Sequence, residues 1–353
     1  MQVIKILSKY TVFVCMVLIS CENKTATTYD QESRFEWQDF ETQKLMAKKI
    51  EFNEPIMKPD QLMVWDTLLV TINRGTEKIF HLFNLKTKEK IGEQITVGQG
   101  PDEMIAPFFI NDSDSIKVYD VMTSTVYSYM INEFVVNPSP MPSRRYKLSE
   151  ANFFSELASL GTNLVGVSYR PDIPCYLFNT NGKKIDGGIG LYPEGPVEYT
   201  DLERVDAYRG LLTSNGSDRL AVSYFFTDLI DIYTDKGELI KRLHGPEHFF
   251  TRFTEYNDGN RMGSRPDHNY YRDAFYSPVS VGDTFFVLYN GKFVNKPEYN
   301  LLAKDILVFS WDGTPLIHYQ LDQGVSRITV DNQKRIIYGI SSDPEYHIVE
   351  YSY

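Results

Sequence analysis

From about residue 50 to the C-terminus, short runs of alternating apolar and polar residues are separated by turns rich in Asp, Asn and Gly. Runs such as DTLLVTI, DSIKVYD and DTFFVLY have the length and the β-branched and aromatic content of strands. No sustained period of 3.6 residues follows residue 50. The pattern therefore predicts an all-β chain.

One unit recurs six times along the chain. It consists of a strand that ends in a polar turn, a second strand and then a hairpin of two more strands. The second strand and the hairpin read, for example, NLVGVSY with CYLFNTNGKKI and DRLAVSYFF with LIDIYTDKGELI. The hairpin centres lie near Phe83, Tyr129, Phe178, Tyr233, Phe309 and Val349. Asn181-Gly182 and Asp312-Gly313 are tight-turn dipeptides. Repeats of this length and content predict a six-bladed β-propeller with four-stranded antiparallel blades, and a pair of β-sandwiches is the structural alternative.

The ends of the units add two expectations. The last unit stops at Tyr353, one strand short of a full blade, so we expect residues 35–52 to supply the missing strand and close the ring. Gly-Pro pairs follow three of the hairpins, at Gly100, Gly195 and Gly245. Gly permits a bend and Pro fixes φ, so these pairs are interpreted as corners leading into the next inner strand.

Several segments carry a resemblance to a known family. VGQGPDEM, VFSWDGTPLIHYQLD, ITVDNQKRIIYGI and DPEYHIVEYSY resemble the TolB-like six-bladed β-propeller lipoproteins of Gram-negative bacteria. The likeness is strongest over residues 280–353 and weak over 22–60. It implies a propeller fold, a lipid anchor and an envelope location, but no established activity, because one fold hosts many functions.

The N-terminus predicts export and lipidation. Lys5 and Lys9 precede an 11-residue apolar run that is too short to span a bilayer, which is typical of a secretory signal. Leu18-Ile19-Ser20-Cys21 resembles a bacterial lipobox, which implies acylation of Cys21; a plain signal peptide that contains a Cys is the alternative. We therefore expect a signal peptide at residues 1–20, a flexible tether at 21–34 and the propeller at 35–353.

Net charge and cysteine content exclude two classes of protein. The 353 residues include 36 Lys or Arg and 47 Asp or Glu, a net charge of −11, so binding to a nucleic-acid backbone is not expected. Three cysteines are too few for a disulfide scaffold.

Two insertions suggest a binding site. Residues 241–273 and 290–304 fall on loops that share one face of a propeller, so they are expected to meet above one blade. Arg binds anions and Tyr stacks on sugars or peptides. The candidate ligand-binding residues are Arg261, Arg265, His268, Tyr271 and Arg272. The alternative is a solvated loop whose Arg residues pair with acids and whose tyrosines pack on the blade.

The sequence lacks several common catalytic motifs. The sequence contains no Gly-x-Ser-x-Gly, His-Glu-x-x-His, Gly-Lys-Ser/Thr or Cys-x-x-Cys motif, so we predict no catalytic residue, metal or cofactor. Cys175 is expected to be a buried small residue. The alternative is a propeller enzyme, a lactonase-like hydrolase or a lyase, with a divalent metal in the central channel. Its nominated ligands are Glu103, Glu198, Glu203 and His268.

The sequence thus favours an envelope lipoprotein whose propeller binds a protein, peptide or carbohydrate and catalyses no reaction. We expect a lipid anchor in the outer rather than the inner membrane, with the domain facing the periplasm or the cell surface. A structural subunit of an envelope assembly is a third possibility.

Overall fold

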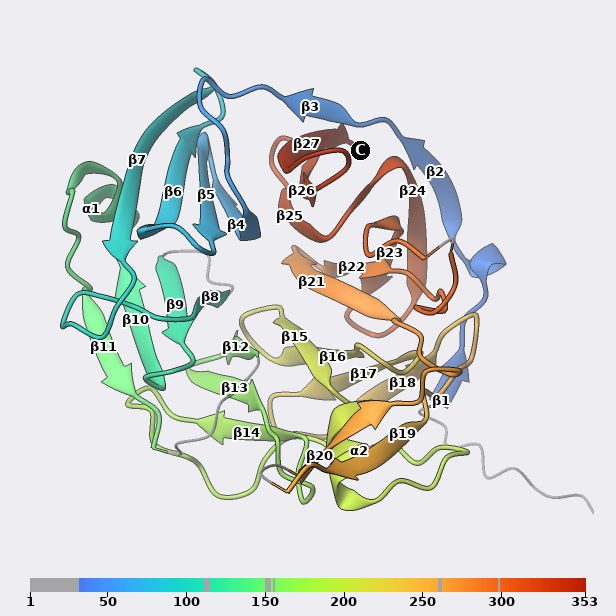
Figure 1. Ribbon diagram of the computed structural model, residues 1–353. Helices are drawn as coiled ribbons and strands as arrows, with labels where there is room; N and C mark the ends of the chain where they lie inside the picture. Colours follow the sequence, from blue (N-terminus) through green and yellow to red (C-terminus); the bar gives the residue numbers. More distant parts are fainter. Residues whose placement is uncertain (1–31, 111–114, 150–153, 155, 260–261, 298) are drawn as a thin grey trace, which may run out of the picture.

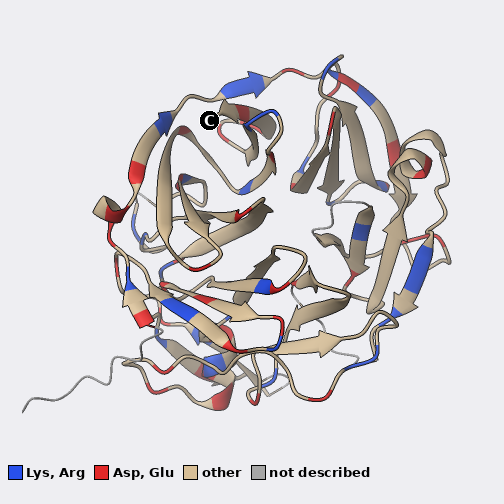
Figure 2. Ribbon diagram, turned by 180° about the vertical axis from the view of Figure 1, so that it is seen from behind, with Lys and Arg blue, Asp and Glu red and all other residues tan. Residues whose placement is uncertain are grey.

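The computed structural model describes residues 32–110, 115–149, 154, 156–259, 262–297 and 299–353. Six sheets stand in a ring around a central channel (Figure 1). The predicted six-bladed propeller is confirmed, and the pair of β-sandwiches is wrong. Acidic and basic residues are interspersed around the rim (Figure 2). Within the described residues, no helix is both long and apolar enough to cross a membrane.

The blades follow the chain in order. Blade 1 contains β4 (Pro59–Trp65), β5 (Leu68–Asn73), β6 (Lys78–Asn84) and β7 (Glu89–Thr96). Blade 2 contains β8 (Pro107–Ile110), β9 (Ile116–Asp120), β10 (Thr125–Tyr129) and β11 (Arg144–Lys147). Blade 3 contains β12 (Leu157–Leu160), β13 (Asn163–Val167) and β14 (Cys175–Phe178). In each blade the first strand is the inner one.

Blades 4 to 6 form the second half of the ring. Blade 4 contains β15 (Gly210–Ser214), β16 (Arg219–Tyr224), β17 (Leu229–Thr234) and β18 (Leu239–His244). Blade 5 contains β21 (Phe275–Val281), β22 (Thr284–Tyr289), β23 (Ala303–Ser310) and β24 (Pro315–Val325). Blade 6 contains β25 (Arg327–Asp331), β26 (Ile336–Ser341) and β27 (His347–Ser352). Three short helices, η1 (Trp37–Asp39), α1 (Ile131–Val136) and α2 (Asp201–Ala207), lie outside the blades.

The N-terminal segment closes the ring, as predicted. β3 (Lys48–Ile50) pairs antiparallel with β27 and completes blade 6. Two further strands were not expected: β1 (Glu32–Arg34) pairs parallel with β18, and β2 (Glu41–Leu45) pairs parallel with β24. Blades 4 and 5 therefore have five strands each. β1 falls within the predicted tether 21–34, of which residues 21–31 lie outside the described part of the chain.

Blade 3 departs from the four-stranded pattern. Its outer position is filled by residues that form only isolated bridges with β14, Phe178 with Lys184 and Cys175 with Ile189. Gly187 and Gly190 have positive φ values of 85° and 81°. Glycines in this conformation interrupt the extended backbone that a regular ladder needs.

Apolar side chains fill the space between neighbouring blades. One cluster joins blades 4 and 5 and contains Phe35, which is 1% exposed and packs edge to face on Phe40 and Phe309. The N-terminal strands are thus held by aromatic packing as well as by backbone pairing. Inner strands start at the face that carries the blade-to-blade connections, here termed the upper face, and end at short turns on the lower face.

Candidate functional site

The two insertions meet on the upper face, as predicted. In the first, β19 (Phe253–Asn257) and β20 (Met262–Pro266) form an antiparallel hairpin between blades 4 and 5. The second joins β22 to β23, and its Val294 amide donates to the Tyr271 carbonyl at 3.0 Å. The described residues of 245–274 and 290–302 are here termed the lid platform. Figure 1 shows its hairpin over α2 and the outer part of blade 4, to one side of the central channel.

The hairpin of the lid platform rests on α2. The Ser264 hydroxyl donates to the Asp206 carboxylate at 2.6 Å, and Phe253 packs edge to face on Phe226. Thr200 and Glu203 form a capping box at the start of α2. The hairpin therefore sits on a helix whose own end is fixed by its side chains.

Arg272 joins the two insertions. Its guanidinium donates to the Gly291 carbonyl, with Nε at 2.9 Å, and pairs with Glu247 at 3.2 Å. The guanidinium carbon also lies 4.1 Å from the ring centroid of Phe249 and 4.7 Å from that of Phe293. This side chain is 13% exposed, and its contacts are those of a structural clamp.

The other candidate residues differ in exposure. Tyr271 is half-buried and packs against Phe226, whereas Arg265 and His268 are exposed. Tyr270 lies beside them, 44% exposed, and carries the Arg252 guanidinium 4.5 Å above its ring. Arg261 lies outside the described residues. The structure thus separates a clamp, Arg272, from an outward-facing group that includes Arg265 and His268.

A buried carboxylate supports the corner that leads into the lid platform. One oxygen of Asp228 accepts hydrogen bonds from the amides of His248 and Glu247, at 2.7 and 3.0 Å. A Cβ at Gly245 would lie 1.7 Å from the other Asp228 oxygen, so this corner requires Gly. Burial raises the pKa of Asp228 to about 7, although the two amide hydrogen bonds oppose the shift.

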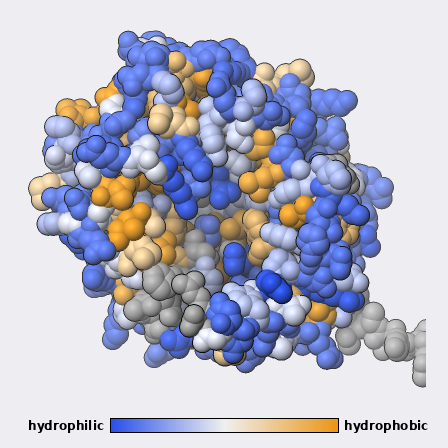
Figure 3. All heavy atoms as spheres, in the orientation of Figure 1, coloured by the Kyte–Doolittle hydropathy of each residue, from blue (hydrophilic) through white to orange (hydrophobic). Residues whose placement is uncertain are grey.

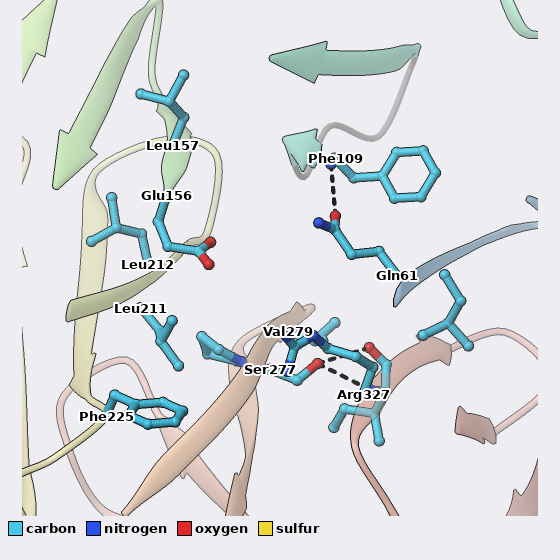
Figure 4. Close-up of a pocket in the computed structure, with 13 residues that line it drawn as sticks. Gln61, Phe109, Glu156, Leu157, Leu211, Leu212, Phe225, Ser277, Val279 and Arg327 are labelled. Carbon is cyan, nitrogen blue, oxygen red and sulfur yellow. Dashed lines mark hydrogen bonds between the residues drawn. The ribbon is translucent and has the colours of Figure 1, made fainter. Parts of the chain in front are cut away.

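The central channel contains a second candidate site. Inner-strand residues from all six blades surround a cavity of about 120 Å³ near the upper end of the channel (Figure 4). Its apolar wall includes Leu157, Leu211, Leu212, Phe225, Val279 and Ile328. The polar side chains Gln61, Glu156, Ser277 and Arg327 also line it. Seen from the side of Figure 1, the space-filling surface is hollowed near its centre (Figure 3).

Two of the channel's polar side chains tie neighbouring blades together. The Gln61 side-chain oxygen accepts from the Phe109 amide at 2.9 Å, which links blades 1 and 2. The Ser277 hydroxyl accepts from the Ile328 amide at 3.0 Å, which links blades 5 and 6. Both bonds are drawn in Figure 4. They fix the positions of the inner strands around the cavity.

The charged pair in the channel is different. The Glu156 carboxylate points into the cavity from blade 3, and Arg327 lies across from it on blade 6 (Figure 4). Within the described residues, the carboxylate makes no hydrogen bond or ion pair, and the Arg327 guanidinium bonds only to the Ser326 carbonyl, at 3.1 Å. Burial raises the pKa of Glu156 to about 7, while Arg327 lowers it and Asp60 raises it.

The sequence nominated other residues for this channel. Glu103 accepts from the Gly100 amide at 2.8 Å within its own corner, and Glu203 belongs to the capping box of α2. Glu198 and His268 are exposed. None of these four lines the cavity. The sequence signal that could have identified this cavity is a polar residue at or near the start of an inner strand. Gln61, Glu156 and Arg327 all fit this description.

The described residues include no group of three or more His, Cys, Asp or Glu side chains arranged to hold a metal ion. Cys175 is buried, as expected, and burial raises the pKa of its thiol to about 12. A thiol in this environment stays protonated near neutral pH, which is unsuited to nucleophilic attack.

Fold and channel together define the class of this protein, a six-bladed β-propeller closed by an N-terminal strand. The family model described as TolB-like 6-blade propeller-like matches residues 34–333. The chain belongs to this TolB-like propeller family.

Two solved structures are similar to this chain at low sequence identity. A DUF4221-family member from Bacteroides vulgatus is 12% identical, with 88% of this chain and 96% of that chain covered and a TM-score of 0.55. A Bacteroides fragilis protein named as exported is 13% identical, with 88% and 98% covered and a TM-score of 0.48. No curated protein matches the chain. At these identities the likeness concerns the fold alone.

Proposed function

We propose that this protein is a lipid-anchored envelope protein whose propeller binds a peptide or carbohydrate partner on the lid platform and catalyses no reaction. The observation that carries the proposal is the outward-facing group on a fixed base. Arg265 and His268 are exposed beside Tyr270, while Arg272 and α2 hold the backbone beneath them. Because these side chains stand on a rigid base, less conformational entropy is lost when a partner binds.

The path of the N-terminal strands supports an anchor opposite the lid platform. β1 runs parallel to β18, which ends at the upper face, so the chain enters β1 from the lower face. Residues 22–31 separate Cys21 from Glu32, and a fully extended segment of that length spans at most about 40 Å. An acylated Cys21 therefore favours a lower face near the membrane and a lid platform directed away from it.

The anchor has a direct test. In a bacterial host, an alkyne fatty acid supplied during growth is expected to label the wild-type chain, with recovery in the membrane fraction. Cys21→Ser is expected to lose the label and the membrane association. Labelling that survives Cys21→Ser would overturn the lipid anchor.

Partner binding is tested separately, with arrays of glycans and peptides. We expect the double variant Arg265→Ala/His268→Ala to bind any array hit at least tenfold more weakly than the wild type. Arg219→Ala, on the lower face, is the matched control and is expected to bind like the wild type. Hits that are indifferent to the double variant would show that the lid platform is not the binding surface.

A further inference from the structure

The central channel holds two opposite charges that do not pair with one another. Glu156 and Arg327 both line the cavity, yet within the described part of the chain no ion pair joins them. Both residues are only partly buried, so their charged groups are accessible from the cavity. Two opposite charges that face one cavity without pairing with each other are available to a ligand that carries both charges.

The remaining polar group of the cavity points to the same conclusion. The Gln61 side-chain oxygen is used by the Phe109 amide, whereas its NH₂ group makes no hydrogen bond within the described residues. Cavity and side chains thus offer one acceptor group, the Glu156 carboxylate, and two donor groups, Arg327 and Gln61. A ligand that satisfies all three carries a cation at one end and a carboxylate at the other.

Size limits this ligand. A cavity of about 120 Å³ is equivalent to about eight water-sized spheres. The leucine, valine and phenylalanine walls leave room for a short apolar spacer between the two charges. An oligosaccharide or a folded peptide segment is too large for this space.

We propose that the channel is a binding site for a small free zwitterion of the amino-acid class. Its ammonium group binds Glu156, and its carboxylate binds Arg327 and the Gln61 amide. A further cavity of about 530 Å³ lies at the lower end of the channel and shares the lining residue Val279 with the first. The site is separate from the lid platform, so its test does not depend on the proposed function.

The test uses the mature chain with Cys21→Ser and a series of ligands whose charges lie progressively further apart. Glycine, β-alanine, γ-aminobutyrate and 5-aminovalerate are added at 10 mM, and thermal melts are recorded at pH 7.5. We expect one or two neighbouring members to raise the melting temperature by at least 2 °C, since a ligand bound only to the native state stabilises it. Ethylamine and propionate, which carry one charge each, are expected to give smaller shifts.

Variants locate the site. Titration calorimetry with the best member is expected to show at least tenfold weaker binding to Glu156→Gln and to Arg327→Gln, and unchanged binding to the exposed control Asp218→Asn. The proposal is overturned if no member shifts the melt, if ethylamine or propionate matches the zwitterions, or if the two channel variants bind like the wild type. The single-charge ligands keep the test valid on the wild type should a variant not fold.

Discussion

Blade 4 and the central channel each contain a carboxylate and an arginine, and the two pairs are arranged in opposite ways. In blade 4, both oxygens of Asp231 accept from Arg242 at 2.8 Å, and the hydroxyls of Tyr224 and Tyr233 add bonds at 2.9 Å. In the channel, Glu156 has no such bond among the described residues. The fully bonded, buried charge of Asp231 stabilises the blade, whereas the unbonded and partly exposed carboxylate of Glu156 is available to a ligand.

The same contrast separates the arginines of the lid platform. Arg272 is surrounded by a carbonyl, a carboxylate and two aromatic rings, whereas Arg265 is exposed. Residue type alone made both of them binding candidates. Their surroundings assign Arg272 to holding the lid platform together and leave Arg265 for contact with a partner.

The largest effect is expected in blade 4. Arg242→Met leaves the Asp231 charge buried without its main partner, so the free energy of unfolding should fall by about 3–5 kcal/mol. Urea unfolding measures this loss. Arg219→Met, which removes an exposed pair with Asp218, should cost less than about 1 kcal/mol. Equal losses from the two variants would contradict the importance of bonding within blade 4.

A smaller effect is expected at the lid platform. Arg272→Ala removes hydrogen bonds to the Gly291 carbonyl and two ring contacts, which corresponds to about 2 kcal/mol. Faster amide hydrogen exchange should be confined to residues 245–297. Arg265→Ala should change the free energy of unfolding by less than about 0.5 kcal/mol. Unchanged exchange in Arg272→Ala would show that the two insertions hold together without the clamp.

The corner below the lid platform should respond to pH. The pKa of Asp228 is about 7 in the folded protein and ordinarily 3.8, so the folded state binds the proton more tightly. Stability should therefore fall as pH rises from about 4 to 7. Asp228→Asn should reduce this fall by about 1–2 kcal/mol, measured as the difference from the wild type because Glu156 contributes with the same sign. Identical pH profiles of stability for Asp228→Asn and the wild type would contradict the raised pKa of Asp228.

The propeller could be predicted because its information is local and repeated. Short β-type runs recur in each blade, and turn dipeptides such as Asp312-Gly313 mark three of the hairpins. β3 was predictable because the last repeat lacked a strand. β1 and β2 gave no such signal. They pair in parallel with distant strands, so no turn marks the pairing, and β1 consists of only three residues, Glu-Ser-Arg.

The channel site could not be predicted for a related reason. Gln61, Glu156 and Arg327 lie in blades 1, 3 and 6 and come together only when the ring closes. The residues nominated instead, such as Glu103 and Glu203, are used by the loops in which they stand. The role of Arg272 was hidden as well, because its acceptor is the backbone carbonyl of Gly291, which any residue type could supply.

The most direct test of this contrast compares Glu156→Gln with Asp231→Asn by urea unfolding at pH 8. Both substitutions replace a carboxylate with an amide of the same shape. We expect Asp231→Asn to lose about 3 kcal/mol or more, because Arg242 then keeps only its longer ion pair with Glu32, at 3.7 Å. Glu156→Gln should be as stable as the wild type or more stable. A loss of stability in Glu156→Gln equal to that of Asp231→Asn would show that the channel carboxylate is a structural group and would contradict the account.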